Sequence, residues 1–187
     1  MAKKAQSTLP NMLLALTVIA LVAAAALAAL NGVTKEPIAK AQQAKVEQAI
    51  SAVLPAFDRL EEQTIDGHLC RLGYDASDNL VGVAVEAGND KGFGGHLQAM
   101  VGFEADGSVH GYQILETHET PGLGAKAGDW FQEGGKGNVI GSKPAVSELK
   151  VKKDGGDIDA ISGSTITSRA FLDIVNEASG VYAQINK

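Results

Sequence analysis

The sequence contains a single cysteine, Cys70, among 187 residues. One thiol cannot close an internal disulfide, and it cannot supply the ligand set of an iron–sulfur cluster or of a cysteine-based zinc site. The fold must therefore depend on a hydrophobic core, and we expect Cys70 to be a buried, unreactive part of it. The cysteine count does not determine the cellular compartment of the protein, because an oxidising compartment permits disulfides without requiring them.

Basic residues are too few for a nucleic-acid-binding protein. Lys and Arg number 16 against 22 Asp and Glu, which gives a formal net charge of −6. The chain has no basic stripe that would release counterions from phosphates. We therefore exclude nucleic acid as a partner.

Several nucleotide-binding and catalytic signatures are also missing. The glycines of residues 122–128 are spaced one residue too widely for a dinucleotide fingerprint, and no βαβ unit surrounds them. Neither a GxxxxGK phosphate-binding loop nor a GxSxG nucleophile elbow occurs. Glu116, His118 and Glu119 lack HExxH spacing, and a charged loop after a strand explains them equally well, so we predict no metal site.

One long apolar run stands near the N-terminus. From Met12 to Leu30 every residue except Thr17 is apolar. At a rise of 1.5 Å per residue, such a run spans roughly the 30 Å hydrocarbon core of a bilayer. Signal-peptide apolar regions are usually shorter, about 7–15 residues, so we favour an uncleaved transmembrane helix over a signal peptide cleaved at residues 26–28.

The orientation of this anchor does not follow from its flanking lysines. Lysines lie on both sides of the span, and large domains cross membranes largely regardless of charge. The ordinary topology for such an anchor places residues 1–11 in the cytoplasm as a short tail and the domain outside.

Residues 34–66 are expected to link the anchor to the globular part. An apolar stripe predicts a helix over residues 35–54, with Pro37 in its first turn and Pro55 at its end. The charged residues 59–66 are expected to continue as a short helix or loop.

The remaining residues, 67–187, show segregated strand and helix patterns. Alternating apolar residues predict strands over 69–74, 80–86, 97–103 and 109–115, with a glycine-rich loop over 88–95 and a hairpin turn at Asp106-Gly107. An irregular stretch, 116–141, and a short strand near 149–151 follow. The chain ends in a helix with an apolar face of Phe171, Ile174, Val175, Ala178, Val181 and Tyr182. This order predicts the α+β class, with a small antiparallel sheet and flanking helices.

A hydroxyl-rich stretch, Asp159 to Ser168, leads into that last helix. Its members include Ser162, Gly163, Ser164, Thr165, Thr167 and Ser168. Unpaired N–H groups and the helix dipole favour an anion at a helix start, and phosphate is the usual one. Serine and threonine are equally good helix caps. From these residues alone, phosphate binding and capping both stay open.

This stretch and an earlier one together resemble a known family. The earlier one is Glu119-Thr120-Pro121-Gly122-Leu123-Gly124, reached from the strand before Glu116. In this order, behind a single anchor, the two motifs resemble the FMN-binding domain family. In length and layout the chain is similar to the G subunits of Rnf ion-translocating ferredoxin:NAD+ oxidoreductases, and the likeness runs from about Thr34 to the C-terminus.

The resemblance implies covalently bound FMN. The family's threonine, matched by Thr165, carries the FMN phosphate as a phosphoester, which a flavin transferase forms from FAD. The transferase reads a D-x-x-[ST]-G-x-T pattern, in which Asp159 fills the first place. The chain departs from the family at Ser164, where alanine is usual; this serine adds a competing hydroxyl.

The resemblance also implies roles for the neighbouring residues. Ser162, Thr167 and Ser168 are expected to donate hydrogen bonds to the phosphodiester, while Gly163 allows close backbone approach. The flavin ring is expected beside the other motif. The full set of expected cofactor-binding residues is Thr165, Ser162, Gly163, Ser164, Thr167, Ser168, Glu119, Thr120, Pro121, Gly122, Leu123 and Gly124.

The implied function is electron relay through FMN in an Rnf complex, by a single-pass protein of the cytoplasmic (inner) membrane with an extracytoplasmic FMN domain. Such a protein has no complete activity alone. Its implied partners are the other membrane subunits, the flavin transferase during maturation, and the lipid bilayer. Two alternatives stay open: an anchored extracytoplasmic binding or assembly protein without redox chemistry, and the flavin subunit of a related electron-transport complex.

Overall fold

The computed structural model describes residues 8–185, and the chain divides into two compact units between Ala44 and Lys45. Most of the expected N-terminal tail, residues 1–7, lies outside the described residues. The second unit begins well before residue 67, where the sequence pattern placed the start of the domain. The reason is that the end of the first helix and an additional strand both pack with the sheet.

Helix α1 covers Leu9–Val53 and contains the whole apolar run of residues 12–30. Its most apolar 18-residue window has a mean hydropathy of 2.7 and is not buried by other parts of the protein. By length and composition it is the one helix among residues 8–185 that is able to cross a membrane. The expected separate helix from residue 35 is wrong, because α1 continues through Pro37 without a break.

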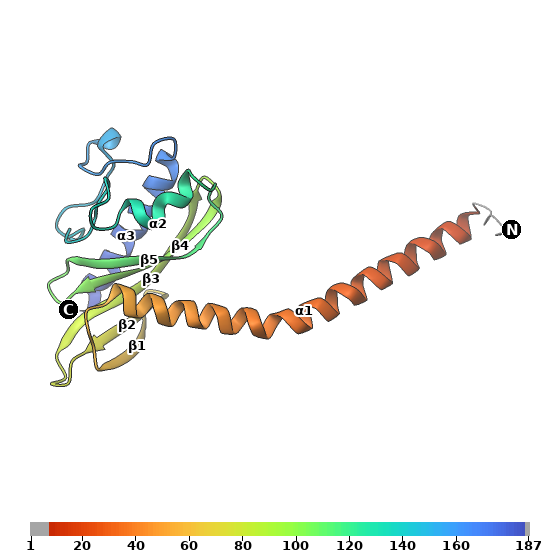
Figure 1. The fold of residues 1–187 in the computed structure, drawn as a ribbon, viewed down its shortest axis with the longest axis horizontal. Helices are drawn as coiled ribbons and strands as arrows, with labels where there is room; N and C mark the ends of the chain where they lie inside the picture. Colours follow the sequence, from red (N-terminus) through yellow and green to blue (C-terminus); the bar gives the residue numbers. More distant parts are fainter. Residues whose placement is uncertain (1–7, 186–187) are drawn as a thin grey trace. The chain divides into compact units, whose positions relative to one another are not determined.

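The second unit contains a five-stranded antiparallel sheet in which strands follow one another in chain order (Figure 1). The strands are β1 (Arg59–Ile65), β2 (His68–Tyr74), β3 (Leu80–Gly92), β4 (Gly95–Glu104) and β5 (Val109–Thr117). Helix α3, Thr165–Ile185, packs on β3 and β4. The predicted α+β class, the four predicted strands (β2 to β5) and the final helix are confirmed.

Strand β1 was not expected, because residues 59–66 had been interpreted as a short helix or loop. The strand is an edge strand with mostly exposed, charged side chains, which is how natural sheets protect an edge. It pairs with β2 through a two-residue turn, Asp66-Gly67, where both residues have positive φ, 48° and 82°. Asp-Gly is a preferred pair for such a turn.

Two further local expectations also differ. The glycine-rich residues 88–95 are largely strand, since β3 extends to Gly92 and pairs with Gly95 across a tight hairpin. The expected strand near 149–151 is reduced to one bridge between Val151 and Ile158.

The main core lies between the sheet and α3. Cys70 is fully buried there, as expected, and burial raises the pKa of its thiol. All six residues of the predicted apolar face of α3 are buried in this core. Helix α3 is thereby held on the sheet along its length.

The opposite face of the sheet is covered in part by the end of α1. Ala49, Ile50 and Val53 pack with Ala84 and Met100 in a second hydrophobic cluster. The backbones approach so closely that a Cβ atom on Gly102 would lie 1.8 Å from the Val53 carbonyl oxygen. The absence of a side chain at Gly102 therefore permits this contact.

Aromatic residues connect the irregular segment after β5 to α3. The Tyr112 hydroxyl donates to the Ala127 carbonyl at 2.6 Å and accepts from the Phe131 N–H. The Phe131 and Phe171 rings stack with their centroids 4.5 Å apart. This segment includes the short helical turns η1 (Gly124–Lys126) and α2 (Ala127–Trp130). The aromatic contacts therefore fix both turns beside α3.

We expect Gly102→Ala to lower the free energy of unfolding by about 3 kcal/mol, because backbone atoms cannot move aside as a side chain can. Gly180→Ala is the matched control: it lies in α3 with nothing within 4 Å of a new Cβ, and it should raise stability by about 0.5–1 kcal/mol. Chemical denaturation of the full chain in detergent measures both. Equal effects of the two variants would contradict the close packing at Gly102.

Candidate functional site

A tight turn positions the start of α3. The Ser164 N–H donates to the Ile161 carbonyl at 2.9 Å, and Gly163, the third residue of this turn, has a φ of 78°. Glycine adopts such a positive φ without the cost that other residues incur. Thr165 follows as the first helical residue and is partly exposed.

The Ser168 hydroxyl fixes that turn from inside. It accepts a hydrogen bond from the Ile161 N–H and donates one to the Ser164 carbonyl, both at 2.9 Å. Ser168 is fully buried. In this structure its hydroxyl serves the helix start, and its expected role at a phosphate stays a prediction.

The Thr167 side chain is also buried, with no exposed surface. Its Oγ1 has no hydrogen-bond partner among the described residues. A Cβ placed on Gly124 would lie 2.8 Å from this oxygen, so Thr167 packs against the Glu119–Gly124 loop. Like Ser168, it does not line the surface hollow described below.

Glu119 begins that loop and connects it to the β3–β4 hairpin. Its side chain is 8% exposed, and its carboxylate accepts a hydrogen bond from the Gly94 N–H at 3.2 Å. A Cβ on Gly124 would lie 2.3 Å from the same carboxylate. The loop, the hairpin and the first turn of α3 thus meet around one buried acidic group.

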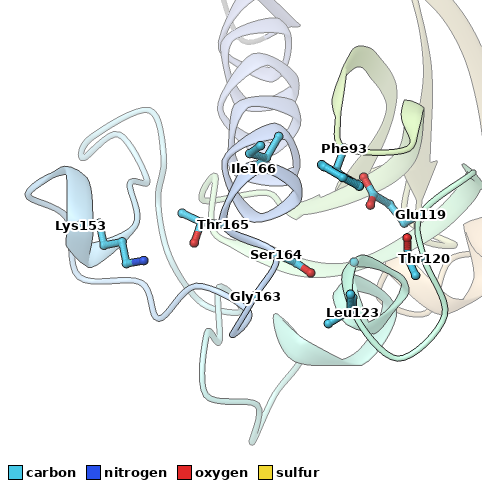
Figure 2. Close-up of a pocket in the computed structure, with 10 residues that line it drawn as sticks. Phe93, Glu119, Thr120, Leu123, Lys153, Gly163, Ser164, Thr165 and Ile166 are labelled. Atoms are coloured by element: carbon cyan, nitrogen blue, oxygen red, sulfur yellow. The ribbon is translucent and has the colours of Figure 1, made fainter.

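These elements enclose a hollow of about 380 Å³ on the surface (Figure 2). Three large apolar side chains on its wall stay exposed: Phe93 at 71%, Ile166 at 49% and Leu123 at 45%. Exposed apolar groups gathered around a hollow are typical of a ligand site. The complete lining is Phe93, Glu119, Thr120, Leu123, Gly124, Lys153, Gly163, Ser164, Thr165 and Ile166.

A second, more polar hollow of about 260 Å³ adjoins the first. Asp159 lines it, with its carboxylate paired to Lys152 at 2.8 Å and its carbonyl accepting from the Trp130 indole N–H. Its lining is Lys152, Lys153, Asp159, Ala160, Ile161, Ser162, Gly163 and Thr165. Thr165, Gly163 and Lys153 belong to both hollows.

The structure therefore brings together most of the residues expected from the two motifs. Thr165, Gly163 and Ser164 share the first hollow with Glu119, Thr120, Leu123 and Gly124, whereas Ser162 and Asp159 line the second. Pro121 and Gly122 are exposed and shape the loop without lining either hollow; Gly122 has a φ of 79°.

Three residues that line the first hollow were not expected: Phe93, Lys153 and Ile166. An aromatic residue between glycines was a usable signal for Phe93, because a hairpin tip exposes its side chain. Nothing in the sequence marks Lys153, which enters the site through the 3₁₀ turn η2, Lys152–Asp154.

The arrangement suits a phosphorylated planar aromatic group. Apolar side chains on one part of the first hollow can pack against a ring. The start of a 21-residue helix offers unpaired N–H groups that can bind a phosphate. The partly exposed Thr165 hydroxyl lies where these two parts meet. A metal is not suggested by the described residues, since they contain no group of three or more His, Cys, Asp or Glu side chains that could hold one.

Comparisons with known proteins agree with this geometry. The model of the FMN-binding domain matches residues 92–180. The G subunit of the Na(+)-translocating ferredoxin:NAD(+) oxidoreductase complex of Acetobacterium woodii is 32% identical, over 93% of this chain and 91% of that protein. The chain belongs to the G-subunit family of ion-translocating oxidoreductase complexes. The G subunit of the Escherichia coli K12 complex is 36% identical, over 84% of this chain and 82% of that protein.

Among solved structures, NqrC of Shewanella oneidensis matches this family member with 22% identity and a TM-score of 0.44. The match covers 71% of this chain and 67% of that one.

Gly124→Ala is expected to disturb the loop, because its Cβ would meet the buried Glu119 carboxylate and the Thr167 hydroxyl. The free energy of unfolding should fall by about 1–3 kcal/mol, as for other overpacked sites. Gly128→Ala, four residues on with nothing within 4 Å, should change it by less than about 1 kcal/mol. Denaturant unfolding compares the pair; an unchanged Gly124→Ala midpoint would contradict the close contact with Glu119.

Proposed function

We propose that this protein is a membrane-anchored flavoprotein subunit that relays electrons through FMN attached covalently to Thr165. The observation that carries the proposal is the place of Thr165, at the first position of α3 on the edge between the two hollows. The FMN-binding domain match supports the choice of cofactor.

Attachment requires a hydroxyl that is reachable and held still. The Thr165 oxygen forms the new bond to the FMN phosphorus, the diphosphate bond of FAD breaks, and AMP leaves while the threonine proton passes to solvent. A flavin transferase carries out this step, with Asp159 in the recognition stretch beside Thr165. After attachment Thr165 serves as a tether and takes no part in turnover.

The chain then binds and shields the cofactor. The N–H groups at the start of α3 and the Ser162 hydroxyl are donors for the phosphodiester oxygens, which stay negatively charged. Phe93, Leu123 and Ile166 provide the apolar contact surface for the ring. FMN supplies the redox chemistry, and the protein supplies position and electrostatics.

The names of the chain's relatives support a relay within a larger assembly. These relatives are named as subunits of ion-translocating oxidoreductase complexes, and this sequence has one cysteine and no dinucleotide fingerprint. We therefore propose that the other subunits of an Rnf complex donate and accept its electrons. Helix α1 anchors the protein in the cytoplasmic membrane, with the FMN domain on the extracytoplasmic side.

Thr165→Val tests the attachment directly. Co-expressed with a flavin transferase, the natural chain should show in-gel flavin fluorescence and the added mass of FMN less one water, while Thr165→Val shows neither. Ser164→Ala, which restores the alanine usual in the family, should keep both signals. Fluorescence that persists in Thr165→Val would transfer the attachment to another hydroxyl, and an unmodified natural chain would favour a non-redox binding or assembly protein.

The proposed topology has its own test. Protease added to intact spheroplasts should remove the FMN domain, and the undigested protein should retain its N-terminus because residues 12–30 form an uncleaved anchor. Intact-mass measurement detects both results. A mature chain beginning near Ala29 would contradict the anchor, and a protected domain would reverse the orientation.

A further inference from the structure

Lys153 occupies an unusual place beside the proposed attachment point. It is one of three residues, with Gly163 and Thr165, that line both hollows. Figure 2 shows its side chain extending toward Thr165 from the turn η2. Among the residues that line the larger hollow, Lys153 is the one that carries a positive charge.

Two acidic groups near Lys153 in sequence, Asp154 and Asp159, are engaged by other cations, whereas the exposed Asp157 forms no ion pair with a described residue. Asp154 receives two hydrogen bonds from Arg169, at 2.6 and 2.7 Å, which hold the pKa of its carboxyl below the usual range. Asp159 pairs with Lys152 at 2.8 Å. Within residues 8–185 Lys153 itself makes no direct ion pair, although its charge contributes to the lowered pKa of the neighbouring Asp154.

The turn that carries Lys153 is well fixed. The Lys152 N–H donates to the Ile158 carbonyl and the Asp154 N–H to the Val151 carbonyl, at 2.9 and 2.8 Å. The Asp154–Arg169 pair then joins the turn to the first part of α3, four residues after Thr165. Since the backbone beneath Lys153 is already ordered, only the lysine side chain has to be ordered for its ammonium group to meet an anion near Thr165.

The two ends of the larger hollow also carry side chains of opposite charge. Glu119, a carboxylate that is 8% exposed, lines it together with Phe93, while Lys153 and Thr165 line the other side (Figure 2). A phosphodiester carries one negative charge, so it is repelled by Glu119 and attracted by Lys153. Both effects favour the phosphate at the Lys153 side.

We propose that Lys153 is the cation that neutralises the phosphodiester of the attached flavin. The inference depends on the proposed FMN attachment at Thr165. Because the Lys153 side chain is exposed, its attraction to the phosphate is screened by salt. It therefore adds to the N–H groups of the helix start and does not replace them.

The test uses full-length protein in detergent, prepared with and without flavinylation. For each variant the measured quantity is the Tm gain that flavinylation produces, at ionic strengths of about 0.01 M and about 1 M, where the Debye length is roughly 30 Å and 3 Å. The variants are Lys153→Gln, Lys153→Arg and Lys126→Gln. Lys126 is an exposed lysine of η1 that is not among the residues lining either hollow.

In the natural chain the Tm gain should be larger at low salt than at high salt. Lys153→Gln should lower the low-salt gain and weaken its salt dependence, because the helix start alone then attracts the phosphate, whereas Lys153→Arg and Lys126→Gln should behave like the natural chain. If Lys153→Gln cannot be flavinylated, successful flavinylation of Lys153→Arg would support the role of the positive charge. If neither variant can be flavinylated, the proposed role of Lys153 is overturned.

A salt dependence in Lys153→Gln as large as that of the natural chain overturns the inference, and so does a natural chain whose gain does not change with salt. These results leave the proposed function intact, provided that the intact mass shows attached FMN. An unmodified natural chain is a different result, because it defeats the attachment itself and the role of Lys153 with it.

Discussion

The site depends on one buried hydroxyl, that of Ser168. It satisfies the Ile161 N–H and the Ser164 carbonyl at once, and so holds the turn that presents Thr165. Buried backbone groups without partners are costly, about 1–3 kcal/mol each. Without the Ser168 hydroxyl the Ile161 N–H would lose its partner and the turn would loosen, while the Ser164 carbonyl would keep the hydrogen bond from the Ser168 N–H at 3.0 Å. Both hollows would change with it, since Gly163 and Thr165 are common to them.

The same constraint explains how five neighbouring hydroxyls divide their roles. Ser168 lies three and seven residues before Phe171 and Val175, and Thr167 lies four and seven before Phe171 and Ile174, so both extend the buried face of α3 by one turn. That helical spacing was present in the sequence and predicts that both side chains are buried. Thr165 is rotated away from this face, which leaves its hydroxyl partly exposed.

Local signals predicted much of the fold, whereas contacts between distant segments could not be predicted. The Asp106-Gly107 turn and the apolar face of the last helix are encoded within a few residues. Strand β1 was missed because its exposed, charged residues lack alternation, although Asp66-Gly67 was a usable turn signal. Lys153 and Phe93 come from segments sixty residues apart, as their numbers show, and only the folded chain brings both to one hollow.

A covalent cofactor fits a site of this construction. The apolar wall leaves Phe93, Ile166 and Leu123 substantially exposed, so contact with a ring there excludes less water than a closed pocket would. Binding from solution must also offset lost translational and rotational freedom. The proposed tether at Thr165 would remove that requirement after one maturation step, because the ring would then return to its surface at a high effective concentration. With that tether, the proposed site could stay open toward a redox partner without losing its flavin, and it would not need the enclosure that helps a noncovalent site to retain its ligand.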